Sequence, residues 1–294
     1  MVEQHRNSAL KSLGDKPRLP IALSVAFYNN LTNFELMMAA VERQTQKDFE
    51  LVICDDGSKP EVVEHIRKRL EKTKVPTLHL WHEDKGFRKN RMLNWGLYYS
   101  DSDYMAFVDQ DCLPHREFLR EHFEGRAEKS VLCGRRMELT PWLSSRLTPD
   151  KIAHGYLEKN LWWILPTGSY MKDNNGLKGV YIQNAWLRAK LNEKPRGIVG
   201  CNFSLFKKDL LTINGFDWRY EAPGTGEDSD IDYRLGLQGV KMKPFVNAAV
   251  QYHVFHKLTT KQNPNEAIFA TVREKHQAVT EFGLRQQLGE AGMA

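Results

Sequence analysis

Short apolar runs alternate with amphipathic helical segments through residues 21–109, and this alternation restricts the fold more than any other feature of the chain. The pattern predicts strands at 21–27, 50–54, 77–81 and 104–108, with helices at 31–43, 61–72 and 88–99 between them. A strand, a crossover helix and a further strand form a unit whose strands run parallel. We therefore expect an α/β fold with a mostly parallel central sheet flanked by helices.

The second half of the chain is less regular and is rich in proline and tryptophan. We expect an exposed loop near 168–178, and the helices and strands are expected as follows: helices at 151–165, 207–213, 227–237 and 265–282, and strands at 197–206 and 246–255. Residues 1–18 are polar and indicate a flexible tail. The remaining chain divides into one domain at 19–258, with halves at 19–139 and 140–258, and a helical extension at 259–294.

Composition narrows the functional classes. Lys and Arg number 42 against 37 Asp and Glu, a net charge of +5 that is too small for a dedicated nucleic-acid binder. A basic excess suits an anionic ligand or a membrane surface, while an ordinary solvated surface explains it equally well.

Cysteine usage and hydropathy bear on localisation. The four cysteines form no CxxC pair, which favours buried free thiols over a zinc site. We find neither a signal-peptide core nor an apolar run long enough to cross a bilayer. We therefore expect a cytoplasmic protein, with peripheral contact at the inner face of the membrane left open.

Acidic residues follow two of the expected strands. Asp55 and Asp56 end the second strand, and Asp109 and Asp111 follow the fourth. Ligands of parallel sheets bind outside the carboxyl ends of the strands, so two acidic ends in one sheet favour a site over local turns.

Asp109 and Asp111 flank one residue, so strand alternation directs both carboxylates to a similar side. A divalent cation would relieve their repulsion and bridge to a diphosphate. A cap for a helix starting near Pro114 explains Asp111 equally well. His253 and His256 near the end of the last expected strand are candidate ligands for manganese, zinc or iron, while partly buried structural histidines are the alternative.

Two further clusters carry chemistry. Acids at 227–232 follow Gly224 and Gly226; the helix dipole explains one acid, and another can serve as a general base. Residues 85–91 form a basic cluster at a helix start, which suits phosphate. Neither glycine-rich nucleotide fingerprint occurs, which argues against P-loop NTPases and Rossmann dehydrogenases.

The chain resembles inverting glycosyltransferases of family two, which have the GT-A fold. The matching stretches in the first half are SVAFYNN, VICDDGS, DKGFRKNRMLNWGL and FVDQDC, the last being the DxD motif. The second half resembles β-1,4-galactosyltransferases and chondroitin-type polymerases in GCNFSLFKKDLLTINGFD, GEDSDIDYRL and HVFH. The matches run from about residue 23 to residue 256, which makes 19–139 the nucleotide-binding half and 140–258 the acceptor and metal half.

The resemblance implies a role for each matching residue. Asp228 would be the catalytic base, and Glu227 would bind sugar hydroxyls. Asp111 and His256 would hold Mn²⁺ or Mg²⁺, with His253 where galactosyltransferases have Met, and Asp109 at the ribose or the metal. The residues implied in donor and nucleotide binding are Phe27, Tyr28, Asn29, Asp55, Asp56, Phe87, Arg88, Lys89, Asp109, Gln110 and Gly200.

The implied activity is that of a hexosyl or N-acetylhexosaminyl transferase of EC 2.4 type, serving polysaccharide or glycolipid biosynthesis. It would move a sugar from a UDP-sugar donor to a saccharide or lipid-linked saccharide acceptor. A nucleotidyltransferase of sugar phosphates and a non-catalytic carbohydrate-binding protein are the alternatives. The tryptophans near 161–164 indicate core packing, with acceptor stacking or a membrane interface as alternatives.

Overall fold

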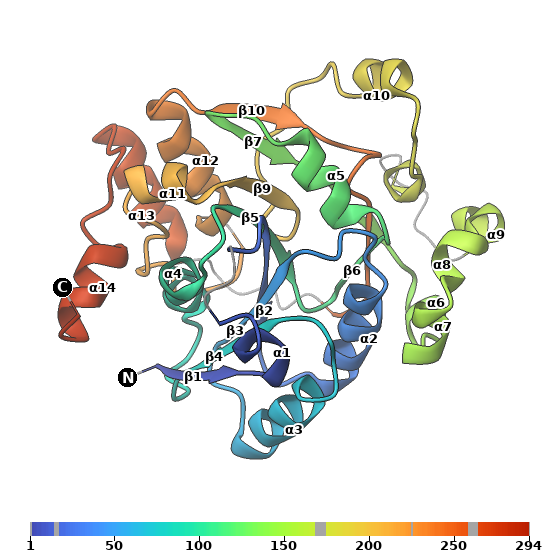
Figure 1. Ribbon diagram of the computed structural model, residues 1–294. Coiled ribbons are helices and arrows are strands. Elements are labelled where there is room, and N and C mark those ends of the chain that lie inside the picture. The colour runs from blue at the N-terminus through green and yellow to red at the C-terminus, as the bar shows by residue number, and fades with distance from the viewer. Residues whose placement is uncertain (1, 15–17, 168–174, 225, 258–263, 294) are drawn as a thin grey trace.

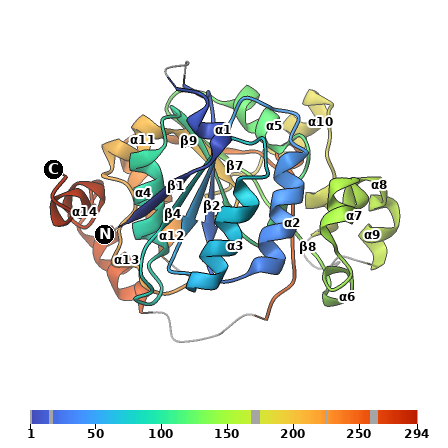
Figure 2. The ribbon, with the colours of Figure 1, turned by 60° about the horizontal axis from the view of Figure 1, so that its bottom comes forward.

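The computed structural model describes residues 2–14, 18–167, 175–224, 226–257 and 264–293. A twisted eight-stranded sheet forms the centre, with helices on both faces (Figures 1 and 2). Its spatial order is β1 (Glu3–Arg6), β4 (Thr77–Trp81), β3 (Glu50–Asp55), β2 (Ala22–Phe27), β5 (Tyr104–Asp109), β9 (Phe203–Phe206), β7 (Ser130–Cys133) and β10 (Lys241–Pro244).

Strands β4, β3, β2 and β5 are parallel to one another, as the alternation predicts. The edge strand β1 is antiparallel to β4, and β9 is antiparallel to both β5 and β7. The expected α/β class with a mostly parallel central sheet is therefore confirmed.

A second, three-stranded sheet lies beyond the end of β5. It has the order β6 (Cys112–Pro114), β11 (Gln251–His253) and β8 (Met137–Glu138). β11 is antiparallel to β6 and parallel to β8. This sheet brings three segments that are distant in sequence to the same end of the molecule.

The helices complete the two outer layers. Those of the first half are α1 (Ser8–Lys11), α2 (Leu31–Glu42), α3 (Pro60–Leu70), α4 (Lys89–Tyr99) and α5 (Phe118–Gly125). Those of the second half are α6 (Pro141–Ser144), α7 (Pro149–Ala153), α8 (Tyr156–Lys159), α9 (Leu161–Thr167), the 3₁₀ turn η2 (Gly176–Gly179), α10 (Ala185–Leu191), α11 (Lys207–Thr212), α12 (Glu227–Leu237), α13 (Asn265–Glu274) and α14 (Leu284–Glu290). No helix among the described residues is both long and apolar enough to cross a bilayer.

The strand period decides which side chains enter which apolar layer. In β2, Leu23, Val25 and Phe27 join the cluster that packs under α2. Ala22 and the β3 residue Val52 join the cluster on the other face, under α4. Buried residues on both faces of the same strands explain why the strands read as continuous apolar runs.

Several local expectations differ from the structure. Residues 3–6 form an edge strand and residues 8–11 a helical turn, where we expected a flexible tail. The expected helix 151–165 is three short helices, since the left-handed Gly155 (φ 74°) separates α7 from α8 and Asn160 ends α8. The expected strands 197–206 and 246–255 shorten to β9 and β11, and the expected helix 265–282 ends at Glu274. Most of the expected loop 168–178 lies outside the described residues.

Candidate functional site

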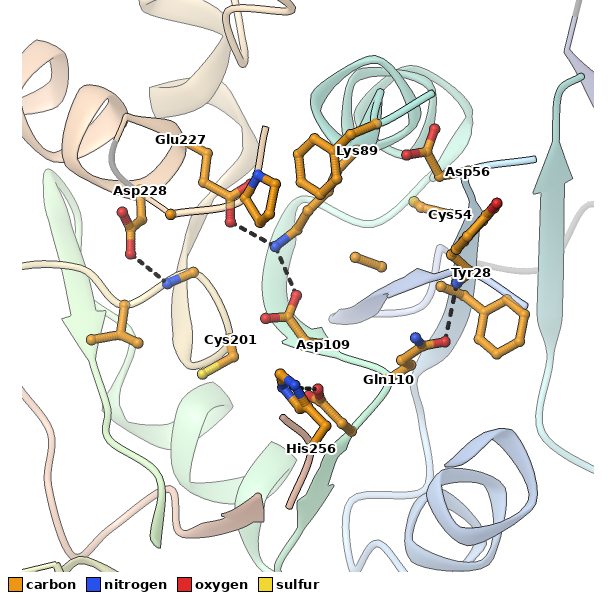
Figure 3. Close-up of a pocket in the computed structure, with 18 of the residues that line it drawn as sticks. Tyr28, Cys54, Asp56, Lys89, Asp109, Gln110, Cys201, Glu227, Asp228 and His256 are labelled. Carbon is orange, nitrogen blue, oxygen red and sulfur yellow. Dashed lines mark hydrogen bonds and ion pairs between the residues drawn. The ribbon is translucent and has the colours of Figure 1, made fainter. Parts of the chain in front are cut away.

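A cavity of about 570 Å³ opens at the carboxyl ends of β2 and β5, between the first turns of α4 and α12 (Figure 3). Residues from both halves of the chain line it. Those expected from the sequence are Phe27, Tyr28, Asp56, Phe87, Lys89, Asp109, Gln110, Asp111, Gly200, Glu227, Asp228, His253 and His256.

The acid and histidine candidates for a metal meet on one wall of this cavity. Asp111 Oδ2 lies 3.2 Å from His256 Nε2 and 3.4 Å from His253 Nε2. Pairing of β11 with β6 sets His253 opposite Cys112, and the Val254 amide donates to the Asp111 carbonyl at 2.8 Å. Since residues 112–114 form β6, and α5 begins only at Phe118, the alternative of Asp111 as a helix cap is wrong.

Glu138 completes this wall, and sequence reasoning missed it. β8 runs parallel to β11 with Glu138 opposite His253, and the Glu138 carboxylate is hydrogen-bonded to His253 Nδ1. Arg136 Nε donates to the other Glu138 oxygen at 2.7 Å. The contact spans strands far apart in sequence, so no local pattern could have identified Glu138.

The charges on this wall stabilise one another. Burial opposes ionisation of Asp111, yet its contacts with both imidazoles hold its pKa well below the usual value. Burial lowers the pKa of His253, but the nearby Asp111 and Glu138 carboxylates outweigh this and raise it to about 9. The hydrogen bond with Asp111 likewise raises the pKa of His256.

These residues fit a divalent cation. His253 Nε2 is buried and has no hydrogen-bond partner of good geometry among the described residues, while Nδ1 is held by Glu138. A carboxylate that orients a histidine in this way is the usual second shell of a metal ligand. One carboxylate and two imidazoles make a mixed oxygen and nitrogen donor set, with the buried Cys112 thiol close to Asp111 and His253.

Lys89 occupies the centre of the cavity and joins the two halves of the chain. Its Nζ lies 2.8 Å from Asp109 Oδ1 and 2.9 Å from Glu227 Oε1, as Figure 3 shows. Burial disfavours the cation, but both carboxylates outweigh it and raise the pKa of Lys89 well above its ordinary value. Asp109 is therefore paired with Lys89, apart from the Asp111 and histidine wall.

Glu227 and Asp228 open α12 and reach the cavity from the opposite side. Glu227 Oε2 is buried without a hydrogen-bond partner among the described residues, which leaves it available to a ligand. Asp228 is held by the amides of Gly200 at 3.2 Å and Ser229 at 2.8 Å. Gly226 (φ 119°) precedes them, and a Cβ there would lie 2.6 Å from the Tyr220 ring, so the entry to this helix requires glycine.

Asp56 and Gln110 line the other end of the cavity. Asp56 accepts hydrogen bonds from the Arg88 amide at 2.7 Å and pairs with His82 Nε2 at 2.8 Å. Burial raises the pKa of Asp56. Gln110 Oε1 accepts a hydrogen bond from the Tyr28 amide at 3.0 Å, and this bond fixes the backbone at the end of β2.

Three expected donor-binding residues do not line this cavity. Asp55 is fully buried beneath it, where it pairs with His79 at 3.0 Å, so it cannot contact a ligand there directly. The Asn29 side chain instead accepts a hydrogen bond at Oδ1 from the Lys59 amide at 2.8 Å. The Arg88 side chain lines a neighbouring, smaller hollow of about 370 Å³, because the start of α4 turns it away while its amide holds Asp56.

Sequence reasoning also missed two neighbours of the expected residues, His82 and Cys201. His82 carries no signal in the sequence, yet it orients Asp56. Cys201 lines the cavity, and its sulfur lies 3.3 Å from Arg136 Nη1. All four cysteines are buried and free, as expected from their spacing.

Comparisons with known proteins show the family of the chain. A family model described as glycosyl transferase family 2 matches residues 23–192, more than half of the chain. A second model, described as the N-terminal domain of galactosyltransferase, matches residues 185–257. Both resemblances expected from the motifs are thereby confirmed.

Individual relatives are more distant. The chain is 25% identical over 267 residues to chondroitin synthase of Escherichia coli, covering 83% of this chain and 36% of that protein. It is 27% identical over 257 residues to hyaluronan synthase of Pasteurella multocida, covering 83% and 26%. It is 21% identical over 235 residues to validoxylamine A glucosyltransferase of Streptomyces hygroscopicus subsp. jinggangensis, covering 76% and 52%. The chain thus spans about a third of the length of the E. coli relative, about a quarter of the hyaluronan synthase and about half of the glucosyltransferase.

Solved structures with the same fold include TarS of S. aureus. The crystal structure of TarS 1–349 in complex with UDP matches with a TM-score of 0.50 at 16% identity, covering 79% of this chain and 60% of that one. A complex with UDP-GlcNAc matches with a TM-score of 0.50 at 14% identity, covering 82% and 60%.

Proposed function

The chain belongs to glycosyl transferase family 2, and from this membership we propose that it transfers a sugar from a UDP-sugar to an acceptor hydroxyl with inversion at the anomeric carbon. The acceptor is a saccharide or a glycolipid. One observation carries the proposal: the Asp111, His253 and His256 wall, the Lys89 ion pairs and the Glu227–Asp228 turn all face one cavity. A carbohydrate-binding module has no need for that combination.

The donor occupies the end of the cavity near Asp56, which the motif resemblance assigns to the nucleotide. Asp56 is held by His82 and the Arg88 amide, so its carboxylate is preorganised to accept a hydrogen bond from a uracil ring. The two matching TarS structures, one in complex with UDP and one with UDP-GlcNAc, support a UDP-sugar as donor.

Asp111, His256 and His253 would hold Mn²⁺ or Mg²⁺. When bound, the ion supplies Lewis-acid neutralisation of the diphosphate leaving group. Glu138 orients His253 for this, and Lys89 adds a fixed positive charge beside the same region. Preorganised charges of this kind stabilise a departing diphosphate without reorganising during the reaction.

Asp228 acts as the general base. Its carboxylate takes the proton of the acceptor hydroxyl, whose oxygen forms a bond to the anomeric carbon as the bond from that carbon to the β-phosphate oxygen breaks. UDP leaves on the face opposite to the attack, so the configuration inverts. The unpaired Oε2 of Glu227 accepts a hydrogen bond from a sugar hydroxyl next to the base.

The test is UDP release from a panel of UDP-sugars, with and without saccharide acceptors, in Mn²⁺ and after removal of the metal by a chelator. We expect release in Mn²⁺, loss of release in the chelator, and loss of release in Asp111→Asn. Asp103→Asn, at an exposed carboxylate, is the control and keeps wild-type release.

Release that survives the chelator would refute the metal assignment. Formation of pyrophosphate from UTP and a sugar phosphate, without UDP release from any UDP-sugar, would favour the nucleotidyltransferase instead.

A further inference from the structure

Helix α10 (Ala185–Leu191) turns its Arg188 side chain toward the protein and its large apolar side chains toward solvent. None of its residues is buried in the described structure. Trp186 is 72% exposed, and Leu187 and Leu191 are 38% and 42% exposed. A surface helix of a globular domain ordinarily buries its apolar side chains, whereas α10 exposes them to solvent.

Polar contacts hold α10 in this orientation. Arg188 is paired with Glu121 of α5, and the pair is shielded from solvent because Glu121 is buried. One turn further along the chain, Asn192 makes two hydrogen bonds to the backbone of Val246. Its Oδ1 accepts one from the Val246 amide at 2.8 Å, and its Nδ2 donates one to the Val246 carbonyl at 3.0 Å. The outward face of α10 is therefore fixed by the fold.

Two further large apolar side chains in this part of the chain are exposed, Leu177 of η2 at 58% and Trp162 of α9 at 78%. Figures 1 and 2 both show α9 and α10 on the side away from the C-terminal helix α14. We call the α10 side chains Trp186, Leu187 and Leu191 the tryptophan face.

The charge around α10 is strongly basic. Residues 175–197 contain a single acid, Glu193, and the following five cations: Lys178, Arg188, Lys190, Lys194 and Arg196. Glu121 neutralises Arg188, and the others remain in excess; Lys190 Nζ lies 5.4 Å from the centre of the Trp186 ring. Protruding Trp and Leu side chains in a segment rich in Lys and Arg are typical of helices that lie in the interface of an anionic bilayer. Two copies of this basic face would repel each other, which disfavours a self-interface.

We propose that the tryptophan face docks on an anionic lipid surface. Trp186 and Leu187 insert among the headgroups, and Lys190 and Lys194 contact lipid phosphates. The proposal does not depend on the proposed reaction, because lipid binding is measured without donor, acceptor or metal.

The experiment is flotation of the full chain with vesicles of phosphatidylcholine alone and with vesicles that also contain phosphatidylglycerol. We expect binding to the anionic vesicles only. The double variant Trp186→Ala/Leu187→Ala should lower the partition coefficient at least about tenfold, since it removes the inserted apolar area. Lys190→Glu/Lys194→Glu should lower it by about fivefold or more per lysine, and added salt should do the same to the parent chain.

The matched control is Leu211→Ala/Leu237→Ala, at leucines that are each 41% exposed elsewhere on the surface, and it should bind as the parent does. All variants should keep the parent's thermal unfolding midpoint, because none of these side chains is buried. Failure of the parent to bind anionic vesicles, or equal loss of binding in the control, would overturn the proposal. Concentration-dependent dimers that Trp186→Ala/Leu187→Ala abolishes would assign the face to a second copy and overturn it too.

Discussion

Asp228 is the residue on which the proposed chemistry depends most directly. Two backbone amides fix its carboxylate at the cavity wall, while the neighbouring Glu227 is paired with Lys89. Of these two acids, Asp228 is the one whose hydrogen bonds come from neutral groups only. That arrangement leaves its charge uncompensated by a cation, as a base that takes a proton requires.

Asp228→Asn keeps the size and the amide contacts of one oxygen but removes the base. We expect turnover to fall by about 10²–10⁴-fold, the usual range for loss of a general base. Donor affinity, measured by calorimetric titration of UDP, should stay at the parent's value. Parent-like turnover in the variant would assign the base elsewhere.

In the proposed reaction Glu138 is a positioning residue, since it would act through its hydrogen bond to His253. In Glu138→Gln the amide can still hydrogen-bond to the His253 ring but supplies no negative charge. Second-shell carboxylates of this kind typically contribute about 10–100-fold to metal affinity. We expect the Mn²⁺ concentration for half-maximal activity to rise by that factor, with turnover recovered at saturating Mn²⁺.

A structural role alone would give a different result for Glu138. The variant would then lose thermal stability and would not recover turnover with added metal. Glu124→Gln on α5, an exposed acid that pairs with Arg120 and does not contact His253, is the control and should titrate with Mn²⁺ as the parent does.

At the scale of elements, the N-terminal segment is an integral part of the sheet. Asn7 stands between β1 and α1 and is fully buried. Its amide group donates to the carbonyls of Leu70 and Val75, both at 2.9 Å, and its oxygen accepts from the amides of Leu10 at 2.9 Å and Thr77 at 3.0 Å. One side chain thus ties the first two elements to α3 and β4.

Asn7→Ala leaves these backbone groups without their partners. Each buried unsatisfied group costs about 1–3 kcal/mol, and water entering the gap offsets part of the loss. We expect the free energy of unfolding in urea to fall by about 3 kcal/mol. Ser8→Ala, whose hydroxyl contacts the exposed Glu71, should change it by less than about 0.5 kcal/mol. Equal unfolding midpoints for the two variants would contradict this account of β1.

At the scale of the whole molecule, buried His122 makes stability depend on pH. Its ring bridges Ser204 at 2.7 Å and Asn202 at 3.2 Å, both in the second half of the chain. Burial lowers its pKa from 6.5 to about 3. As the pH falls below 6.5, the pKa of histidine in the unfolded chain, the unfolded state binds a proton while His122 in the folded state stays neutral. The free energy of unfolding therefore falls.

The free energy of unfolding should fall by up to about 1.4 kcal/mol per pH unit, the value for the uptake of one proton. This slope should continue until the pH reaches the pKa of His122 in the folded state. The measurement is urea unfolding from neutral to mildly acidic pH in the parent and in His122→Asn. The variant is less stable than the parent at neutral pH, and the difference between their free energies of unfolding should become smaller as the pH falls. His154→Asn, at an exposed histidine, should show the parent's pH profile. Identical profiles for the two variants would rule out His122 as the source.

Much of the fold and part of the site follow from local patterns. β4 and α12 have the expected bounds, and β2, β3 and β5 lie within a residue or so of theirs. A buried parallel strand is a continuous apolar run whose end is marked by the first polar residues, so the run also locates the site. Asp56, Asp109 and Asp111 could be placed at the cavity for that reason.

Other features depend on partners that are distant in sequence. Neighbouring Asp55 and Asp56 look alike in the sequence, but the pairing of β3 with β4 buries Asp55 against His79 while Asp56 reaches the cavity. Strand β9 enters the sheet antiparallel between β5 and β7, and no local period shows it.

Asp109 and Asp111 show the same division at the candidate metal site. Local patterns are enough to place two acids at the end of β5, at the ligand-binding edge, because strand period and apolar runs are local properties. The contacts of Asp111 with His253 and His256, the unforeseen contact of Glu138 with His253 and the pairing of Asp109 with Lys89 depend on the folded arrangement. The physical reason is that charge pairing and ligand geometry depend on which strands lie side by side, and that is decided by packing of the whole chain.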